Sequence, residues 1–168
     1  MKKTLLQSLL FAGLCCLFSF ANLFINPSAL SLSTNYSPSS SSVALEHEFG
    51  EIEYTELQSY LELLNDDPPY VVVIDARNEA AYELGHIPGA YLVDHYRQQQ
   101  YLDQLAPLIS QTPIVVVYCK GGDCEDSIFL ARDLAYKYDV AVESLFIYEG
   151  GTNDWQANGL ELKTGIER

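Results

Sequence analysis

The sequence predicts an α/β domain with a five-stranded, mainly parallel β-sheet that is covered by helices on both faces. Residues 70–75 and 114–118 form continuous apolar runs rich in β-branched side chains, which is typical of strands buried on both faces of a parallel sheet. Segments with helical spacing of apolar residues separate the strands, and this alternation indicates right-handed crossovers. With 168 residues, 48% of them hydrophobic, the chain has room for one such core.

The first expected elements are a short strand at residues 51–53 and a helix that follows it. Thr55 is a good N-cap, and Gln58 three residues later would complete a capping box. In the rest of the chain, glycine, proline and asparagine residues mark the turns between the expected elements. The remaining elements are expected, in order, as a strand at 70–75, a helix at 78–84, strands at 90–93 and 114–118 around a helix at 100–109, a helix from 126, a strand at 144–148 and a helix at 153–157.

The N-terminal residues 1–25 have the pattern of a signal or transmembrane anchor segment. Lys2 and Lys3 precede the 22 uncharged residues 4–25, which as one hydrophobic helix would extend about 33 Å, roughly the hydrocarbon thickness of a bilayer. Small residues at Ser19 and Ala21 also fit signal-peptidase cleavage after Ala21, so both alternatives stay open.

Three parts of the chain follow from this pattern: the N-terminal segment 1–25, an uncharged Ser/Pro-rich tether at 26–44, and a folded domain at 45–168. We expect the domain to face the periplasm, either tethered to the inner membrane by a single-pass anchor or released by cleavage.

The net charge of the chain limits which partners it can bind. Nine Lys and Arg residues against 23 Asp and Glu give a formal net charge of -14, which repels nucleic acid and anionic membrane surfaces. We therefore expect no nucleic-acid partner, and membrane association through the N-terminal segment. Because Cys15 and Cys16 lie in the apolar segment, only Cys119 and Cys124 remain in the polar part, too few for a disulfide scaffold.

The loop after residues 114–118 carries the candidate chemistry, because ligands of parallel sheets bind beyond the carboxyl ends of the strands. Cys119 ends this strand, and two glycines lead into a helix. Backbone N–H groups and a helix N-terminus favour the thiolate, which is the nucleophilic form of cysteine. We therefore predict that Cys119 is the nucleophile and that the anion cradle consists of Lys120, Gly121, Gly122 and Asp123.

Four pieces of sequence have the spacing of a known family: VIDAR at 73–77, AYELGHIPGA at 81–90, VYC at 117–119, and EGG at 149–151 followed by Trp155. Together they resemble the rhodanese-like domain family over about residues 51–162. The resemblance implies a five-stranded three-layer fold and a cysteine, here Cys119, that carries sulfane sulfur as a persulfide. It also implies a sulfur donor and an acceptor thiol or cyanide as partners.

The loop departs from the family pattern in its charge. Active sulfurtransferases of the family commonly end a six-residue loop with a cation, and Cys124 occupies that position here. Within residues 119–127, Lys120 is opposed by three carboxylates, so the formal charge is -2. These carboxylates disfavour a thiolate and repel thiosulfate. Residues 119–127 contain no arginine that could bind a phosphate group, which argues against a phosphatase. We therefore expect a thiol or persulfide, free or on a protein, as donor or acceptor.

Cys124 has two possible roles, as a resolving thiol for Cys119 or as a small buried residue that packs the following helix. Two other function classes also stay open. One is a non-catalytic binding module whose acidic face contacts a basic partner. The other is a thiol–disulfide oxidoreductase that uses both cysteines.

Other polar residues are expected to support the site. Asp75 and Arg77 should form an ion pair that holds the turn, and His86 should hydrogen-bond backbone. His47 and His95 have no ligand partners at metal spacing in the sequence, so it predicts neither a metal site nor a cofactor.

Overall fold

The structure, a computed structural model, describes Gln7 and residues 46–64 and 68–168. The chain divides into two units, Met1–Ser41 and Ser42–Arg168, and the second unit contains the sheet. Apart from Gln7, the predicted anchor or signal segment and the whole of the tether lie outside the described residues, so both stay predictions. None of the helices in the described parts is long and apolar enough to cross a membrane.

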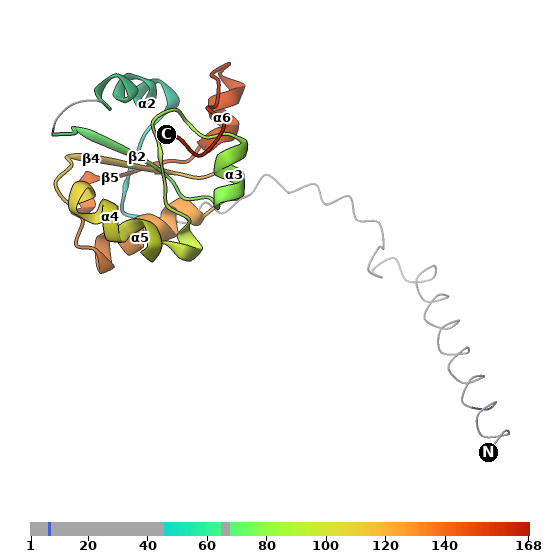
Figure 1. Cartoon of the computed structure of the whole chain (residues 1–168), viewed down its shortest axis with the longest axis horizontal. Coiled ribbons are helices and arrows are strands. Elements are labelled where there is room, and N and C mark those ends of the chain that lie inside the picture. The colour runs from blue at the N-terminus through green and yellow to red at the C-terminus, as the bar shows by residue number, and fades with distance from the viewer. Residues whose placement is uncertain (1–6, 8–45, 65–67) are drawn as a thin grey trace. The chain divides into compact units, whose positions relative to one another are not determined.

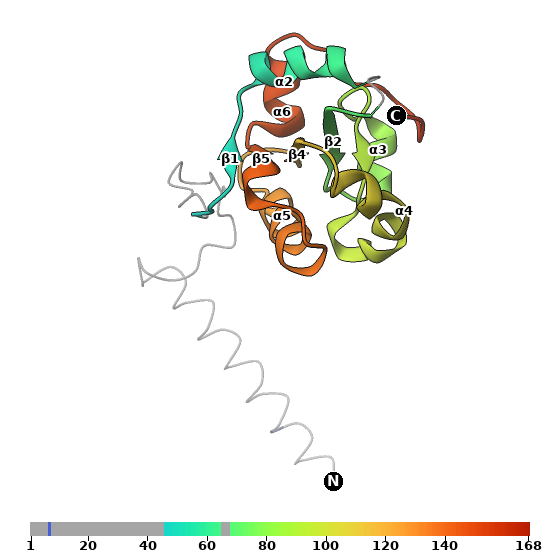
Figure 2. The same ribbon diagram turned by 90° about the vertical axis from the view of Figure 1, so that its left-hand side faces the viewer.

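Five parallel strands form one sheet in the order β1-β5-β4-β2-β3. Figure 1 labels β2, β4 and β5 within it, and Figure 2 shows β1, β5, β4 and β2 side by side. The long central pair, β2 and β4, is aligned from Val71 opposite Ile114 to Asp75 opposite Tyr118, and nearly all of its residues are buried. This confirms the predicted parallel sheet. The strands are β1 (Gly50–Glu51), β2 (Val71–Asp75), β3 (Tyr91–Leu92), β4 (Ile114–Tyr118) and β5 (Leu145–Tyr148).

Helices cover both faces of the sheet, so the predicted three-layer arrangement is confirmed. In Figure 2, α2 and α6 lie on one side of the strands and α4 and α5 on the other. Two apolar clusters fill the spaces between the layers: Val72, Ile74, Val115 and Val117 belong to one, and Val71, Val73 and Val116 to the other. The helices are α2 (Tyr54–Tyr60), α3 (Glu79–Leu84), α4 (Gln99–Ile109), α5 (Asp126–Lys137) and α6 (Gly151–Ala157).

The predicted cap of the first helix is wrong. Helix α2 begins at Tyr54, and Thr55 lies inside its first turn. Glu53 has an extended backbone and its carbonyl already accepts the N–H of Leu57 at 3.0 Å, so the helix begins before a Thr55 hydroxyl could cap it. By contrast, the side chain of Asn78 caps α3 by accepting the N–H of Ala81 at 2.9 Å.

Candidate active site

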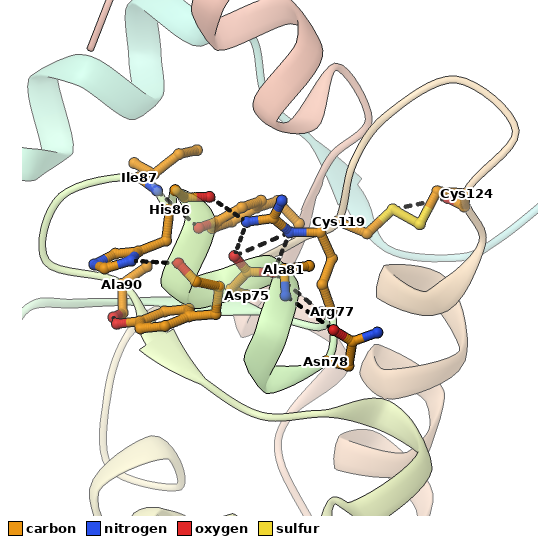
Figure 3. Close-up of polar contacts among 12 residues, drawn as sticks. Asp75, Arg77, Asn78, Ala81, His86, Ile87, Ala90, Cys119 and Cys124 are labelled. Atoms are coloured by element: carbon orange, nitrogen blue, oxygen red, sulfur yellow. Dashed lines mark hydrogen bonds and ion pairs between the residues drawn. A yellow bond between two sulfur atoms is a disulfide. The ribbon is translucent and has the colours of Figure 1, made fainter. Parts of the chain in front are cut away.

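The sheet brings the predicted site residues to one edge, where β2 and β4 end side by side. Asp75 lies opposite Tyr118 in the strand register, and the N–H of Ala76 donates to the carbonyl of Tyr118 at 2.8 Å. Cys119 follows Tyr118 directly. The turn after β2 and the loop after β4 therefore leave the same end of the sheet, as Figure 3 shows.

Cys119 is 2% exposed, and its sulfur is paired with that of Cys124 in a disulfide whose Cα atoms are 6.4 Å apart. The buried hydroxyl of Ser127, in the first turn of α5, lies 3.6 Å from the Cys119 sulfur. The Cys124 carbonyl oxygen lies 2.9 Å from the same sulfur. After reduction, this carbonyl would accept the thiol proton, whereas Ser127 could donate to a thiolate.

The disulfide form does not build the predicted cradle of backbone N–H groups. Within the described loop, no backbone N–H donates to the Cys119 sulfur, and the contacts to it come from the Cys124 carbonyl and Ser127. Lys120 and Asp123 are exposed. An N–H cradle around a reduced Cys119 stays a prediction.

Glycines allow the loop after β4 to pack against the start of α6. Gly121 has φ +91°, and a Cβ there would collide with the Gly150 carbonyl. The first N–H groups after Gly151 are satisfied by this loop: Thr152 donates to the Cys119 carbonyl at 3.2 Å and Asn153 to the Lys120 carbonyl at 3.0 Å. The EGG sequence therefore has a steric and hydrogen-bonding role in placing the cysteine loop.

The predicted ion pair between Asp75 and Arg77 is present. The Asp75 carboxylate is fully buried, and it accepts Arg77 Nη2 at 2.6 Å and Nε at 2.9 Å. Arg77 Nη2 also donates to the Gly85 carbonyl at 2.7 Å. Burial lowers the pKa of Arg77, but its hydrogen bonds and charge interaction with Asp75 outweigh this and raise the pKa overall. Arg77 is thus bound to the turn.

His86 is fully buried beside this pair and contacts backbone, as predicted. Its Nδ1 donates to the Tyr82 carbonyl at 3.0 Å, and the two rings stack with centroids 3.7 Å apart. Its backbone pairs with Lys163 near the C-terminus. These contacts make His86 an anchor of the turn.

The structure also identifies residues that the sequence reasoning missed. Tyr118 accepts the N–H of Ile87 at 3.0 Å, and burial raises its pKa well above the usual range, which keeps the hydroxyl neutral. Ser127 could have been found, because a first-turn hydroxyl directly follows the predicted loop. His47 has no ligand partner at metal spacing along the sequence, but the fold brings ligand atoms of Glu51 and Glu149 within 4.8 Å of it.

Known proteins resemble the chain in sequence and in fold. The HTH-type transcriptional regulator Rv0324 of Mycobacterium tuberculosis is 32% identical over 98 residues, which cover 56% of this chain and 38% of the length of that relative. The BH2092 protein from Bacillus halodurans has a TM-score of 0.57 at 19% identity, covering 70% of this chain and 78% of its own.

A thiosulfate sulfurtransferase from Pseudomonas aeruginosa aligns with a TM-score of 0.51 at 23% identity, covering 71% of this chain and 21% of its own. At these identities, both structural similarities show the fold alone. The family model of the rhodanese-like domain matches residues 56–158, more than half of the chain. With its five-stranded parallel sheet and a cysteine at the end of β4, the chain therefore belongs to the rhodanese-like domain family.

Proposed function

We propose that the protein handles sulfane sulfur: Cys119 accepts it as a persulfide, and Cys124 acts as the resolving thiol. The observation that carries this proposal is the pairing of the two sulfurs at the end of β4, with the Cys119 side of the pair buried. The similar fold of the thiosulfate sulfurtransferase from Pseudomonas aeruginosa supports a role in sulfur transfer.

The reaction begins with the reduced pair. The Cys119 thiolate attacks the outer sulfur of a donor persulfide, a Cys119–sulfur bond forms, and the donor leaves as its thiolate. An acceptor thiolate that attacks the outer sulfur of the Cys119 persulfide takes the sulfur away and restores the Cys119 thiolate. The Ser127 hydroxyl, 3.6 Å from the Cys119 sulfur, would stabilise the thiolate in both steps.

Cys124 provides a second exit from the persulfide. Its thiolate attacks the inner sulfur, the Cys119–Cys124 disulfide forms, and the outer sulfur leaves as hydrosulfide. Two thiols are oxidised and one sulfane sulfur is reduced to sulfide, so no other oxidant is needed. A dithiol or two monothiols then reduce the disulfide and return the protein to its starting state.

The charge around the loop favours a thiol-type partner over thiosulfate. Asp126 has a carboxylate oxygen 3.9 Å from the Cys124 sulfur, and its other oxygen accepts the Tyr96 hydroxyl at 3.1 Å. Lys120 provides one positive charge within a loop whose formal charge is -2. A dianion such as thiosulfate would be repelled here, whereas a persulfide on a small thiol or a protein carries less charge.

Mass spectrometry and sulfide release test this scheme on the full-length protein with Cys15 and Cys16 replaced by serine. After reduction and treatment with polysulfide, the parent should form the disulfide and release one sulfide for each disulfide formed. Cys124→Ser should retain one extra sulfur on Cys119 and, apart from the shortened polysulfide or hydrosulfide that leaves the donor, release no sulfide until a thiol is added. Cys119→Ser should do neither.

A thiol–disulfide oxidoreductase is the second candidate, because the same disulfide favours it. It requires that the pair cycle with a dithiol partner while Cys124→Ser gains no sulfur from polysulfide. That result would exclude the persulfide scheme. Absence of both sulfur loading and disulfide cycling would leave the non-catalytic binding module.

Thiosulfate:cyanide activity tests the charge argument. Wild-type activity should be weak, and Cys124→Arg should raise it about tenfold by placing a cationic donor at the loop end. Cys124→Ser is the matched control, because it also removes the disulfide but adds no charge. An equal rise in both variants would show that loss of the disulfide, and not charge, controls access.

We also propose that the domain is exported, on the basis of Lys2, Lys3 and the uncharged residues 4–25. A C-terminal reporter active only outside the cytoplasm should give signal, and a reporter that folds only in the cytosol should not. The opposite pattern would reject export. The length of the mature chain would distinguish anchoring from cleavage after Ala21.

A further inference from the structure

A histidine and two carboxylates meet where the edge strand β1 joins β5. His47 lies just before β1, Glu51 ends β1, and Glu149 follows β5. One ligand atom from each of these residues lies within 4.8 Å of the other two. They are far apart in sequence, and the parallel pairing of β1 with β5 brings them together.

The imidazole of His47 is the least exposed side chain of this cluster. Its side chain is 2% exposed, and its Nε2 lies 3.5 Å from a carboxylate oxygen of Glu149. Among the described residues, nothing forms a hydrogen bond with its Nδ1. The ring packs against Phe49, with centroids 5.7 Å apart. Nε2 faces the Glu149 carboxylate, and the lone pair of this nitrogen would bind a metal ion while Nδ1 carries the proton.

We propose that His47, Glu51 and Glu149 bind a first-row divalent cation of the Zn²⁺ type. Two ligands that each lie about 2.1 Å from a tetrahedral ion are about 3.4 Å apart, which matches the separation of His47 from Glu149. Both carboxylates are exposed, so their side chains can adjust to the ion. The imidazole selects against Mg²⁺ and Ca²⁺, which prefer oxygen ligands.

The charge around the site supports a cation. The two carboxylates balance the charge of a divalent ion, and they also line a cavity of about 590 Å³ together with Glu53 and Asp154. This acidic cavity would raise the local concentration of cations. Three protein ligands would leave at least one coordination position open to water.

The site would connect the edge of the sheet to the cysteine loop. Strand β1 has two residues, so an ion bound by His47 and Glu51 would hold it to the end of β5. Glu149 precedes the two glycines whose backbone packs against the loop of Cys119. We therefore expect bound metal to stabilise the domain, since a ligand that binds only the folded state raises its stability.

Cobalt spectroscopy with zinc competition tests the proposal on the disulfide-paired, full-length protein carrying Cys15→Ser and Cys16→Ser, which offers no free thiolate. One equivalent of Co²⁺ should give a d–d absorption band. Added Zn²⁺ should displace the bound Co²⁺ and abolish this band. Zinc at about 100 times its Kd should raise the Tm by about 5–10 °C. Ca²⁺ and Mg²⁺ should not compete at equal concentration.

Matched variants identify the ligands. His47→Gln and Glu149→Gln should each weaken binding at least about tenfold. His95→Gln and Glu53→Gln should bind normally, because they remove an imidazole and a cavity carboxylate outside the cluster. If His47→Gln does not fold, the exposed Glu51→Gln and Glu149→Gln variants decide the matter. The proposal would be overturned if the parent showed no saturable binding. It would also be overturned if the Glu51→Gln and Glu149→Gln variants bound the metal as tightly as the parent.

Discussion

The turn after β2 and the loop after β4 leave the same edge of the sheet, yet they are held in opposite ways. The turn after β2 is fixed by charge: the buried Asp75 carboxylate binds Arg77, which also donates to the Gly85 carbonyl. The loop after β4 is fixed by backbone packing and a disulfide, with Gly121 against Gly150 and Cys119 joined to Cys124. Its charged residues, Lys120 and Asp123, face solvent.

This difference would give the two segments separate roles: the turn after β2 supports the site, and the loop after β4 carries the proposed cysteine chemistry. Because Arg77 binds both the Asp75 carboxylate and the Gly85 carbonyl, most of its hydrogen bonds hold the turn after β2 together. The loop after β4 has no such charge network, so opening the disulfide breaks one covalent bond while the contacts of the neighbouring turn remain. Functional loops are often carried on a well-packed scaffold, which is the arrangement that the proposed chemistry would use.

Breaking the ion pair should give the largest effect. Arg77→Met leaves a buried carboxylate without its partner and should lower the free energy of unfolding by about 3–5 kcal/mol. Urea unfolding followed by circular dichroism measures this change. The control is Lys137→Met, which removes a partner of Asp133 that is 62% exposed and should cost less than about 1 kcal/mol. Similar losses in both variants would mean that the turn after β2 is not the rigid element.

Two neighbouring glycines separate packing from backbone strain in the loop after β4. Gly121 and Gly122 have φ +91° and +69°, but a Cβ at Gly121 would strike the Gly150 carbonyl, whereas one at Gly122 meets nothing within 4 Å. Gly122→Ala should cost about 1–2 kcal/mol. Gly121→Ala should cost about 1–3 kcal/mol more and slow the formation of the disulfide. Equal costs would show that the contact with Gly150 does not position the loop.

The smallest effect concerns the ion pair between Asp133 and the exposed Lys137, which serves above as a control. Burial raises the pKa of Asp133, but hydrogen bonds from Lys137 and Gln98 outweigh this and lower the pKa overall. Its contribution is therefore present above the unfolded-state pKa and is lost as pH falls through the lowered folded-state value. The stability of wild type over Asp133→Asn should shrink by less than about 0.5 kcal/mol between about pH 6 and pH 2. A larger change would give this surface pair a structural role.

Local sequence patterns were enough to predict the layers. Residues 114–118 were predicted as a strand and form β4, and residues 78–84 contain the cap and body of α3. Such patterns act over a few residues, since an apolar run of β-branched side chains favours one kind of element and one degree of burial. The start of α2 was misplaced because the Glu53 carbonyl began the helix before Thr55 could cap it.

The sequence by itself determined the parallel sheet, the position of Cys119 at a strand end and the shortage of cations in its loop, because each follows from residue type and near-neighbour spacing. Tertiary structure alone decided that Gly121 packs on Gly150 and that His47 meets Glu149. These contacts depend on strand order, which places β5 between β1 and β4. Residues distant along the chain become neighbours only when the whole sheet has formed, and no local spacing records that pairing.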